Sequence, residues 1–287
     1  MIGTLAGIRV LEQGTFITGP CAGMMLADLG ADVIKVESPE GDPYRAYQSG
    51  LYSPHFQAYN RNKRSLALDL KNPQDHALFD GLVGEADVFI QNFRPGTAER
   101  LGIGVARLHE LNPRLVYCSI SGFGSSGPYT ERPSYDSVAQ ALSGFLSVVV
   151  DYKRPQFLGP ALADAITGLY AAYGVLGALV ERGRTGRGRL VEVSMLEAMA
   201  HFAVEPFAAY FALGETPTSA DRPRLAQAYI LHTGDQRLIA IHLSSLEKFW
   251  VGLVAALEAP ELARDPRFNT RLGRICLLYT SPSPRDA

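Results

Sequence analysis

Short apolar runs alternate with helical patterns along the first 200 residues. Runs typical of buried strands lie at residues 8–11, 32–37, 65–70, 86–90, 115–120 and 189–193. Small and apolar residues at helical spacing lie between them, at residues 19–29, 73–83, 98–101, 135–149 and 158–179. A strand, a helix and a second strand in this order predict a parallel pair with a right-handed crossover. The pattern therefore predicts an α/β fold built on a parallel sheet.

The stretch Leu158–Leu179 is the most continuous apolar segment, and the rest of the chain is interpreted around it. Gly159-Pro160 is a typical entry turn, and from Ala161 onward nearly every residue is small or apolar, which predicts a buried helix. Asp164 is its one charged group. Because a carboxylate in a first turn gains from the helix dipole, we expect Asp164 to stay ionised. Two interpretations stay open: a residue that only caps the helix, or a functional carboxylate.

A linker and a second domain are predicted towards the end of the chain. Residues 213–225 are rich in Pro, Thr and charge. Two apolar runs that flank Gly234-Asp235-Gln236 then predict a hairpin, and residues 245–257 predict an amphipathic helix. We therefore expect a large domain over residues 1–212, the linker, and the start of a smaller α/β domain over residues 226–275. Before the linker, Ser194 and Glu197 have the spacing of a capping box.

The last twelve residues, 276–287, do not continue this pattern. They resemble translated sequencing-adaptor read-through, so they are left out of the fold prediction as non-native. We accordingly expect the natural chain to continue beyond Ile275. We also expect the truncated chain to expose apolar surface and to dimerise poorly.

Charge and composition exclude several functional classes. The formal net charge of -2 gives no electrostatic basis for binding nucleic acid or an anionic membrane. No apolar run reaches the ~18 residues that a membrane span needs, and the start lacks the features of a signal peptide. The scattered cysteines Cys21, Cys118 and Cys276 fit a reducing cytoplasm, and neither they nor the histidines have a metal-site spacing. We expect a cytoplasmic protein without a metal.

Candidate ligand-binding features follow the predicted strands. Glu37 ends the second strand, as in dinucleotide-binding folds, but the glycines before it do not form GxGxxG. Asn92 and Phe93 lie just beyond the carboxyl end of another strand, where α/β sheets bind ligands. Residues 122–128 form a glycine-rich loop that lacks the Gly-Lys-Ser/Thr ending of a P-loop. The basic cluster Asn60–Arg64 is compatible with a solvated turn or with a phosphate contact.

Seven segments, in order, resemble the family III CoA-transferases, the superfamily that includes formyl-CoA transferase, carnitine CoA-transferase and alpha-methylacyl-CoA racemase. The likeness runs from about Leu5 to Arg274. The segments are GPCAGMMLADLGADVIKVE at 19–37, NRNKRSLALDLK at 60–71, QNFRPGTAERLGI at 91–103, SGFGSSGP at 121–128, YDSVAQALSG at 135–144, ADAITG at 163–168 and GRGRLVEVSMLEA at 186–198.

The resemblance implies a fold and a reaction. It implies a Rossmann-like large domain, a smaller domain and a homodimer of interlocked rings, with the large domain completed by a C-terminal segment. It implies an enzyme that moves CoA from an acyl-CoA to a carboxylic acid, with Asp164 of the ADxxxG motif as the nucleophile and an aspartyl covalent intermediate. Coenzyme A thioesters would be substrates, and no cofactor would be bound permanently.

The resemblance also implies a set of CoA contacts along the strand ends. Lys71 and Arg100 are the expected phosphate partners within it, since both cations bind phosphate oxygens. The matching positions in this chain are Thr15, Phe16, Leu68, Lys71, Asn92, Phe93, Arg100, Leu101 and Tyr135.

Departures from the family pattern bear on the reaction. The racemase has a histidine where this chain has Tyr135, which removes one of two acid/base groups and favours transfer. Formyl-CoA transferase has a glutamine in place of Ile17, and because isoleucine cannot hydrogen-bond oxalate, a formate/oxalate pair is disfavoured. It has an arginine in place of Ser38, so we expect one phosphate contact to be absent. An acyl-CoA racemase or epimerase, a nucleotide-dependent oxidoreductase and a non-catalytic CoA-binding module remain as alternatives, and the donor and acceptor acids stay open.

Overall fold

The computed structural model describes residues 3–48, 50–157, 159–244 and 246–277, and the chain divides into two compact units. The first unit comprises Met1–Leu146 with Phe157–Val204, and the second comprises Ser147–Gln156 with Glu205–Ala287. Of the residues expected to be non-native, only 276 and 277 are described, and they end the last helix. Residues 278–287 lie outside the described residues.

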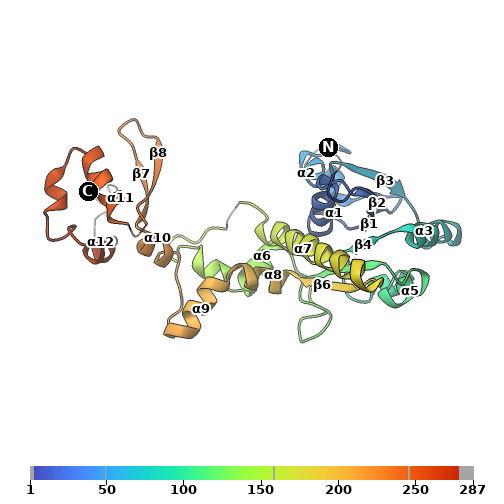
Figure 1. The fold of residues 1–287 in the computed structure, drawn as a ribbon. Coiled ribbons are helices and arrows are strands. Elements are labelled where there is room, and N and C mark those ends of the chain that lie inside the picture. The colour runs from blue at the N-terminus through green and yellow to red at the C-terminus, as the bar shows by residue number, and fades with distance from the viewer. Residues whose placement is uncertain (1–2, 49, 158, 245, 278–287) are drawn as a thin grey trace. The chain divides into compact units, whose positions relative to one another are not determined.

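A six-stranded parallel sheet organises the first unit, which confirms the predicted α/β fold (Figure 1). Its strands are β1 (Arg9–Gln13), β2 (Asp32–Glu37), β3 (Lys63–Ala67), β4 (Val88–Gln91), β5 (Val116–Ser121) and β6 (Leu190–Ser194). All neighbours pair in parallel, in the order β3-β2-β1-β4-β5-β6. The order reverses between β1 and β4, and ligands of such sheets bind outside the carboxyl ends of the strands at this switch point.

Helices cover both faces of the sheet because successive strand residues point to opposite faces. On β1, Val10 belongs to a core that includes α1 and α7, whereas Leu11 belongs to a second core that includes α3 and α5. The helices of this unit are α1 (Thr18–Asp28), α2 (Pro54–Asn60), α3 (Pro73–Glu85), α4 (Thr97–Arg100), α5 (Val105–Leu111), α6 (Asp136–Leu142), α7 (Leu162–Thr185) and α8 (Met195–Phe202), with 3₁₀ turns η1 (Pro43–Ala46) and η2 (Phe145–Val148), the latter running into the second unit. Ser194 accepts a hydrogen bond from the N–H of Glu197 (3.1 Å), which confirms the expected cap of α8.

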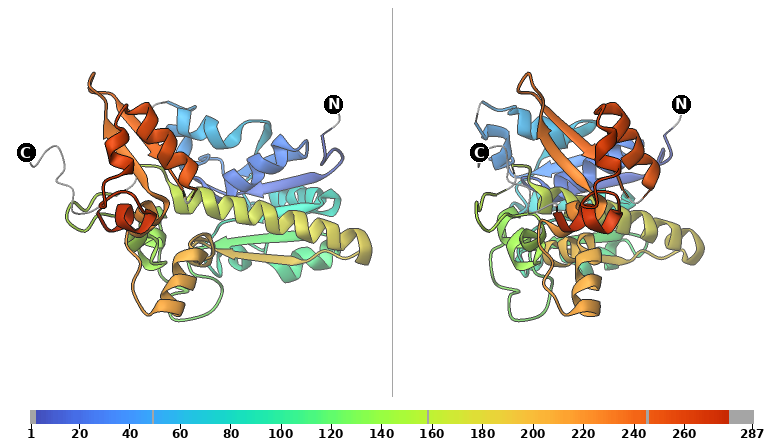
Figure 2. Two further views of the ribbon diagram at one scale, coloured as in Figure 1. Left: turned by 60° about the vertical axis from the view of Figure 1, so that its left-hand side comes forward. Right: turned by 90° about the vertical axis from the view of Figure 1, so that its left-hand side faces the viewer.

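Helix α7 is the long helix expected from the apolar stretch, and it runs alongside β5 and β6 (Figure 2). Leu158 lies outside the described residues. Among the described residues, α7 is the one helix that is long and apolar enough to cross a membrane by length and composition, with a mean hydropathy of 1.4. The expectation that no segment has this length rested on unbroken apolar runs, which do not include this helix. Ala171, Val175 and Ala178 pack into the core on the sheet. This packing is that of a core helix.

The second unit is a small antiparallel hairpin with helices. It contains α9 (Val204–Leu213, of which Val204 belongs to the first unit), α10 (Asp221–Ala226), β7 (Ala228–His232), β8 (Leu238–His242), α11 (Glu247–Ala256), η3 (Pro260–Ala263) and α12 (Arg271–Leu277). The expected hairpin is confirmed, with Tyr229 opposite Ile241. Trp250 packs on Leu243 and lies 4.7 Å from the guanidinium of Arg274, measured at the ring centroid.

Three local expectations were wrong. The segment 38–60, for which the sequence pattern predicted no helix, contains η1 and α2, which begin with prolines after the capping residues Asp42 and Ser53. Strand β3 starts at Lys63 rather than at residue 65, because the basic cluster itself joins the sheet. The helix expected over 135–149 ends at Leu142, and Gly144 adopts a left-handed conformation (φ 78°) before η2.

Gly168 allows α1 to approach α7, and this contact gives a test of the fold. A Cβ at Gly168 would lie 2.6 Å from Cβ of Cys21 and 2.9 Å from the carbonyl oxygen of Thr18, whereas a Cβ at exposed Gly177 in the same helix meets nothing within 4 Å. We expect Gly168→Ala to lower the free energy of unfolding by about 1–3 kcal/mol, and Gly177→Ala to raise it by about 0.5–1 kcal/mol. Urea denaturation measures both, and equal shifts would contradict the close helix contact.

Candidate active site

Two adjoining cavities lie at the carboxyl ends of the strands, at the switch point of the sheet. One has a volume of about 380 Å³ and the other of about 280 Å³. Thr15, which follows β1, and Phe93, which follows β4, line both of them. We call the two cavities together the carboxyl-end trough.

The trough brings together most of the residues that the sequence predicted. The larger cavity is lined by Thr15, Phe16, Asn92, Phe93, Tyr135 and Asp164 from that set. The smaller cavity is lined by Thr15, Leu68, Lys71, Phe93 and Leu101. Asp164 and Lys71 therefore line different cavities of one trough. Arg100 lines neither cavity, and its guanidinium donates to Oγ1 of Thr97 (2.8 Å).

The helix that carries Asp164 is capped by a different carboxylate. Oδ1 of Asp136, in the first turn of α6, accepts hydrogen bonds from the N–H groups of Ala163 (2.7 Å) and Asp164 (3.3 Å). The formal cap residue, Ala161, has no side chain for this role. Among the described residues, the carboxylate of Asp164 takes part in no hydrogen bond or ion pair. The structure thus rejects the interpretation of Asp164 as a helix cap, because Asp136 satisfies the free N–H groups.

The pKa of Asp164 is raised to about 7 from its ordinary value of 3.8. Burial is the main cause, since it penalises the charged form, and the neighbouring charge of Asp136 adds to it. The expectation that the helix dipole keeps this carboxyl fully ionised was therefore wrong in direction. A pKa near neutrality leaves a large fraction of ionised, weakly solvated carboxylate at physiological pH, which suits a nucleophile.

Asn92 contacts the protein backbone with both ends of its carboxamide. Its Oδ1 accepts from the N–H of Thr15 (3.0 Å), and its Nδ2 donates to the carbonyl of Thr15 (2.9 Å) and to Oγ1 of Thr18 (2.8 Å). Asn92 therefore fixes the loop after β1, which lines both cavities. The polar atoms of the Asn92 side chain are thus bound to the loop, and the loop lines the trough.

Other charged residues at the strand ends are paired within the chain. Glu37 accepts from Arg45 at 2.6 and 2.7 Å and from Ser65 at 2.9 Å. Burial opposes its ionisation, but these hydrogen bonds lower its pKa to about 2. In the basic cluster, Lys63 pairs with Glu12, and the guanidiniums pair with carboxylates of α1 and β2. Arg61 and Asn62 form an exposed turn, as one interpretation expected, but the cations of the cluster are paired, so the cluster is not an open phosphate site.

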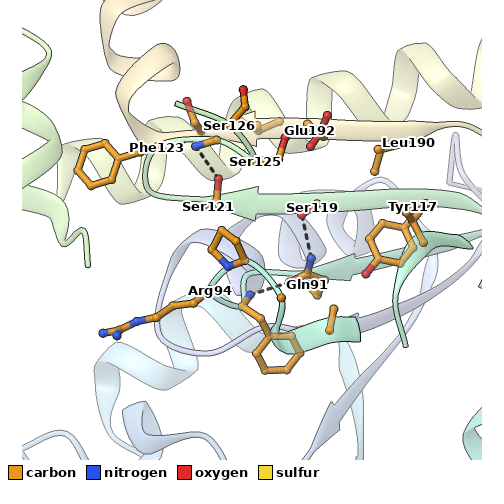
Figure 3. A pocket seen from close by; sticks show the side chains of 18 of the residues that line it. Gln91, Arg94, Tyr117, Ser119, Ser121, Phe123, Ser125, Ser126, Leu190 and Glu192 are labelled. Atoms are coloured by element: carbon orange, nitrogen blue, oxygen red, sulfur yellow. Dashed lines mark hydrogen bonds between the residues drawn. The ribbon is translucent and has the colours of Figure 1, made fainter. Parts of the chain in front are cut away.

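A third cavity, of about 500 Å³, lies beside the trough at the ends of β4, β5 and β6 (Figure 3). Residues 123–126 of the glycine-rich loop line it, and the N–H of Gly124 donates to Oγ of Ser121 (2.9 Å). Gln91 donates to Ser119 (2.8 Å) and accepts from the N–H of Phe93 (2.7 Å). The cavity shares Phe93 and Ser121 with the larger cavity of the trough.

The sequence model of CoA-transferase family III matches residues 5–277 of this chain. The chain belongs to CoA-transferase family III. This agrees with the resemblance found in the seven motifs, and relatives at 35–38% identity over most of the chain are named CoA-transferases, so the protein is a CoA-transferase.

Known members of CoA-transferase family III match most of the chain. Succinyl-CoA–D-citramalate CoA-transferase of Chloroflexus aurantiacus is 36% identical over 277 residues, which cover 94% of this chain and 69% of the relative. Succinate–glutarate CoA-transferase of Agrobacterium fabrum is 38% identical, over 94% of this chain and 70% of the relative. The crystal structure of a CaiB/BaiF family protein from Brucella suis superposes with a TM-score of 0.85 and 35% identity, over 96% of this chain and 75% of that chain.

Several residues of the site were not identified as candidates from the sequence. Gln13 and Ser134 each line a cavity of the trough and carry a buried polar atom, Oε1 and Oγ, without a hydrogen-bond partner among the described residues. Arg94 and Arg132 line the larger cavity and form no ion pair within the described residues. Gln13 was detectable in principle, since it is polar at the carboxyl end of a buried strand.

The raised pKa of Asp164 predicts a pH-dependent effect on stability. Because its pKa in the folded protein (about 7) exceeds its ordinary value (3.8), the folded state binds this proton more tightly, and stability falls as pH rises between these values. We expect Asp164→Asn to raise the free energy of unfolding by about 1–3 kcal/mol at pH 8 and to change it little at pH 4. Thermal unfolding of the variant and wild type across this range measures it. A variant that gains no stability towards pH 8 would contradict the assigned pKa.

Proposed function

We propose that this CoA-transferase moves CoA from an acyl-CoA to a carboxylic acid through a covalent intermediate on Asp164. The single observation that carries the proposal is the free carboxylate of Asp164: it lines the trough while Asp136 caps its helix. A carboxylate spared from structural hydrogen bonds, with a pKa near 7, is available to attack a thioester.

The chemistry proceeds in four exchanges without net proton transfer. An oxygen of the Asp164 carboxylate attacks the thioester carbonyl, the C–S bond breaks, and CoA leaves as a thiolate, which gives a mixed anhydride of Asp164 and the donor acid. The thiolate attacks the aspartyl carbonyl, which forms an aspartyl-CoA thioester and releases the first acid as a carboxylate. The acceptor carboxylate attacks that thioester and displaces the thiolate, giving a second anhydride. The thiolate then attacks the acceptor carbonyl, which yields the new acyl-CoA and restores Asp164.

The trough supplies the surfaces that CoA requires. We place the thioester end in the larger cavity, against Thr15, Phe16, Asn92, Phe93 and Tyr135, and the nucleotide end in the smaller cavity, against Leu68, Lys71 and Leu101. Lys71 is an exposed cation there and suits a phosphate group, and Arg100 would have to leave Thr97 to join it. Gly122, at the start of the glycine-rich loop, lines the larger cavity and brings backbone groups near the reacting carbonyl.

We further propose dicarboxylic acids as donor and acceptor. Two relatives act, by name, on succinate and glutarate or on succinyl-CoA and citramalate. In this chain, Arg94 and Arg132 line the cavity of Asp164 and have no carboxylate partner among the described residues. A guanidinium binds a second carboxylate in a bidentate manner. Ile17 lines the same cavity with an apolar wall, which suits the methylene chain of such acids better than oxalate.

Loss of the nucleophile gives the most direct kinetic test of this function. We expect the protein to transfer CoA between succinate and glutarate or related acids, and Asp164→Asn to lower kcat by at least about 10³-fold. Asp75→Asn is a matched control, because Asp75 is likewise the third residue of its helix but lines neither cavity of the trough. Formation of the new acyl-CoA is followed by liquid chromatography. An Asp164→Asn variant as active as the control would overturn the proposal.

Asp136 provides a second, pH-based test. In Asp136→Asn the amide oxygen still accepts the two N–H groups, but the charge that raises the pKa of Asp164 is gone. We expect the rate of the first CoA release to rise with pH through a midpoint near 7 in the wild type and through a lower midpoint in Asp136→Asn. Stopped-flow detection of the thiolate at pH 5–9 measures both profiles. An unchanged or higher midpoint in the variant would refute the role of Asp136.

A further inference from the structure

The loop Gly14–Ile17, between β1 and α1, forms part of both cavities, and charged side chains from β2 and from the segment after it hold its backbone. Nζ of Lys35 donates to the carbonyl of Gly14 at 2.7 Å. Oδ1 of Asp42 accepts the N–H of Phe16 at 3.2 Å. Together with the two bonds from Asn92, half of the backbone N–H and C=O groups of the loop are bound by side chains from elsewhere in the fold.

The conformation of the loop needs external support. Phe16 has a φ of 60°, in the left-handed region that is unfavourable for a residue other than glycine. The residue is 46% exposed, so burial in the core does not offset this cost. The hydrogen bonds to the flanking backbone groups therefore hold the strained residue in place.

Lys35 and Asp42 belong to a buried quartet of charges. Glu12 and Lys35 are opposite each other in the β1–β2 register, Lys63 comes from β3, and Asp42 caps η1. The side chains are at most 2% exposed. Nζ of Lys35 lies 3.0 Å from Asp42 and 3.4 Å from Glu12, and Nζ of Lys63 lies 2.8 Å from Glu12. Two cations and two anions balance, so the quartet satisfies its own charges.

The distances show which contact the Lys35 ammonium favours. A cross-strand ion pair would need only the carboxylate of Glu12, yet Nζ lies closest to the carbonyl of Gly14, at 2.7 Å against 3.4 Å. Burial disfavours the charged ammonium, but the carboxylates of Glu12 and Asp42 outweigh this and hold its pKa above the ordinary value. A cation is thus kept charged inside the protein and directed at the loop of the trough.

We propose that Lys35 and Asp42 are positioning residues for CoA binding: they hold the strained Gly14–Phe16 backbone in the shape that lines both cavities of the trough. The inference rests on the proposed function, because it takes a CoA thioester as the ligand of the trough. Lys35 lines neither cavity, and Asp42, which lies at the wall of the smaller cavity, binds the loop through its Oδ1. Asp164 and its cap lie on α7 and α6, and among the described residues no hydrogen bond or ion pair joins either of them to Lys35 or Asp42.

The separation of binding from chemistry gives the test. We expect Lys35→Met to raise the KM for acyl-CoA and the Kd for CoA by about tenfold or more, while kcat changes by less than about threefold. Arg182→Met is the matched control. Arg182 is also buried and pairs with Asp87 at 2.8 Å, but at the amino end of β4, away from the trough. We expect Arg182→Met to lower the stability of the protein and to leave the KM for acyl-CoA and the Kd for CoA unchanged.

A second pair of variants covers the case in which Lys35→Met does not fold. Asp42→Asn retains an oxygen for the N–H of Phe16, whereas Asp42→Leu removes it. We expect Asp42→Leu to weaken CoA binding about tenfold and Asp42→Asn to restore most of the affinity. Isothermal titration calorimetry with CoA measures each variant without turnover. Equal affinities for Asp42→Leu and the wild type would overturn the proposal.

The remaining outcomes separate the two proposals. A wild type that binds CoA but transfers it to no acid refutes the proposed function and leaves the positioning role measurable by affinity. A wild type that transfers CoA, with Lys35→Met and Arg182→Met equal in KM, refutes the positioning role alone. A KM that rises equally in both variants would show general destabilisation and would also refute it.

Discussion

The capping of α7 by Asp136 is the interaction on which the site depends. Every helix start leaves N–H groups that need an acceptor, and a nearby aspartate in the first turn is an ordinary way to supply one. Here Asp136 of α6 supplies the acceptor from another helix. The carboxylate of Asp164 therefore does not have to cap α7, and the helix still holds it in a fixed position. Burial raises the pKa of Asp164, and the charge of the same neighbour adds to this, so the contact fixes the start of the helix and also contributes to the ionisation of the proposed nucleophile.

The parallel sheet gives this carboxylate its surroundings. The strand order reverses between β1 and β4, and the loops that diverge there, with Thr15 and Phe93, form the trough. A crossover loop at such a point has few partners within the sheet, so its backbone is bound by side chains, from Asn92 on one side and from the buried charges on the other. Close packing of α1 on α7 at Gly168 brings the loop before α1 and the start of α7 to the same end of the sheet.

The apolar pattern predicted the parallel sheet and its main helices, because buried strands and a core helix have long, unambiguous signals. The motif resemblance placed Asp164, Phe93 and Lys71, and the structure brings them to one trough. The sequence could not show that Asp136 caps α7, since the two segments lie 28 residues apart and a first-turn aspartate is normally its own cap. It also gave the wrong ionisation for Asp164, because burial depends on the tertiary surroundings. The quartet was partly predictable, since charged residues at Glu12 and Lys35 in buried strands imply ion-pair partners. Asp42 could be identified as such a partner only from the fold.

Peptide mass spectrometry around Asp164 tests the central claim most directly. The protein is incubated with succinyl-CoA, treated with hydroxylamine or borohydride and digested. The account predicts a mass change on the peptide that carries Asp164, dependent on the acyl-CoA and absent from the Asp164→Asn variant. An unmodified Asp164 under a panel of acyl-CoA donors, with CoA bound, would contradict the covalent mechanism and make the trough a binding site without nucleophilic catalysis.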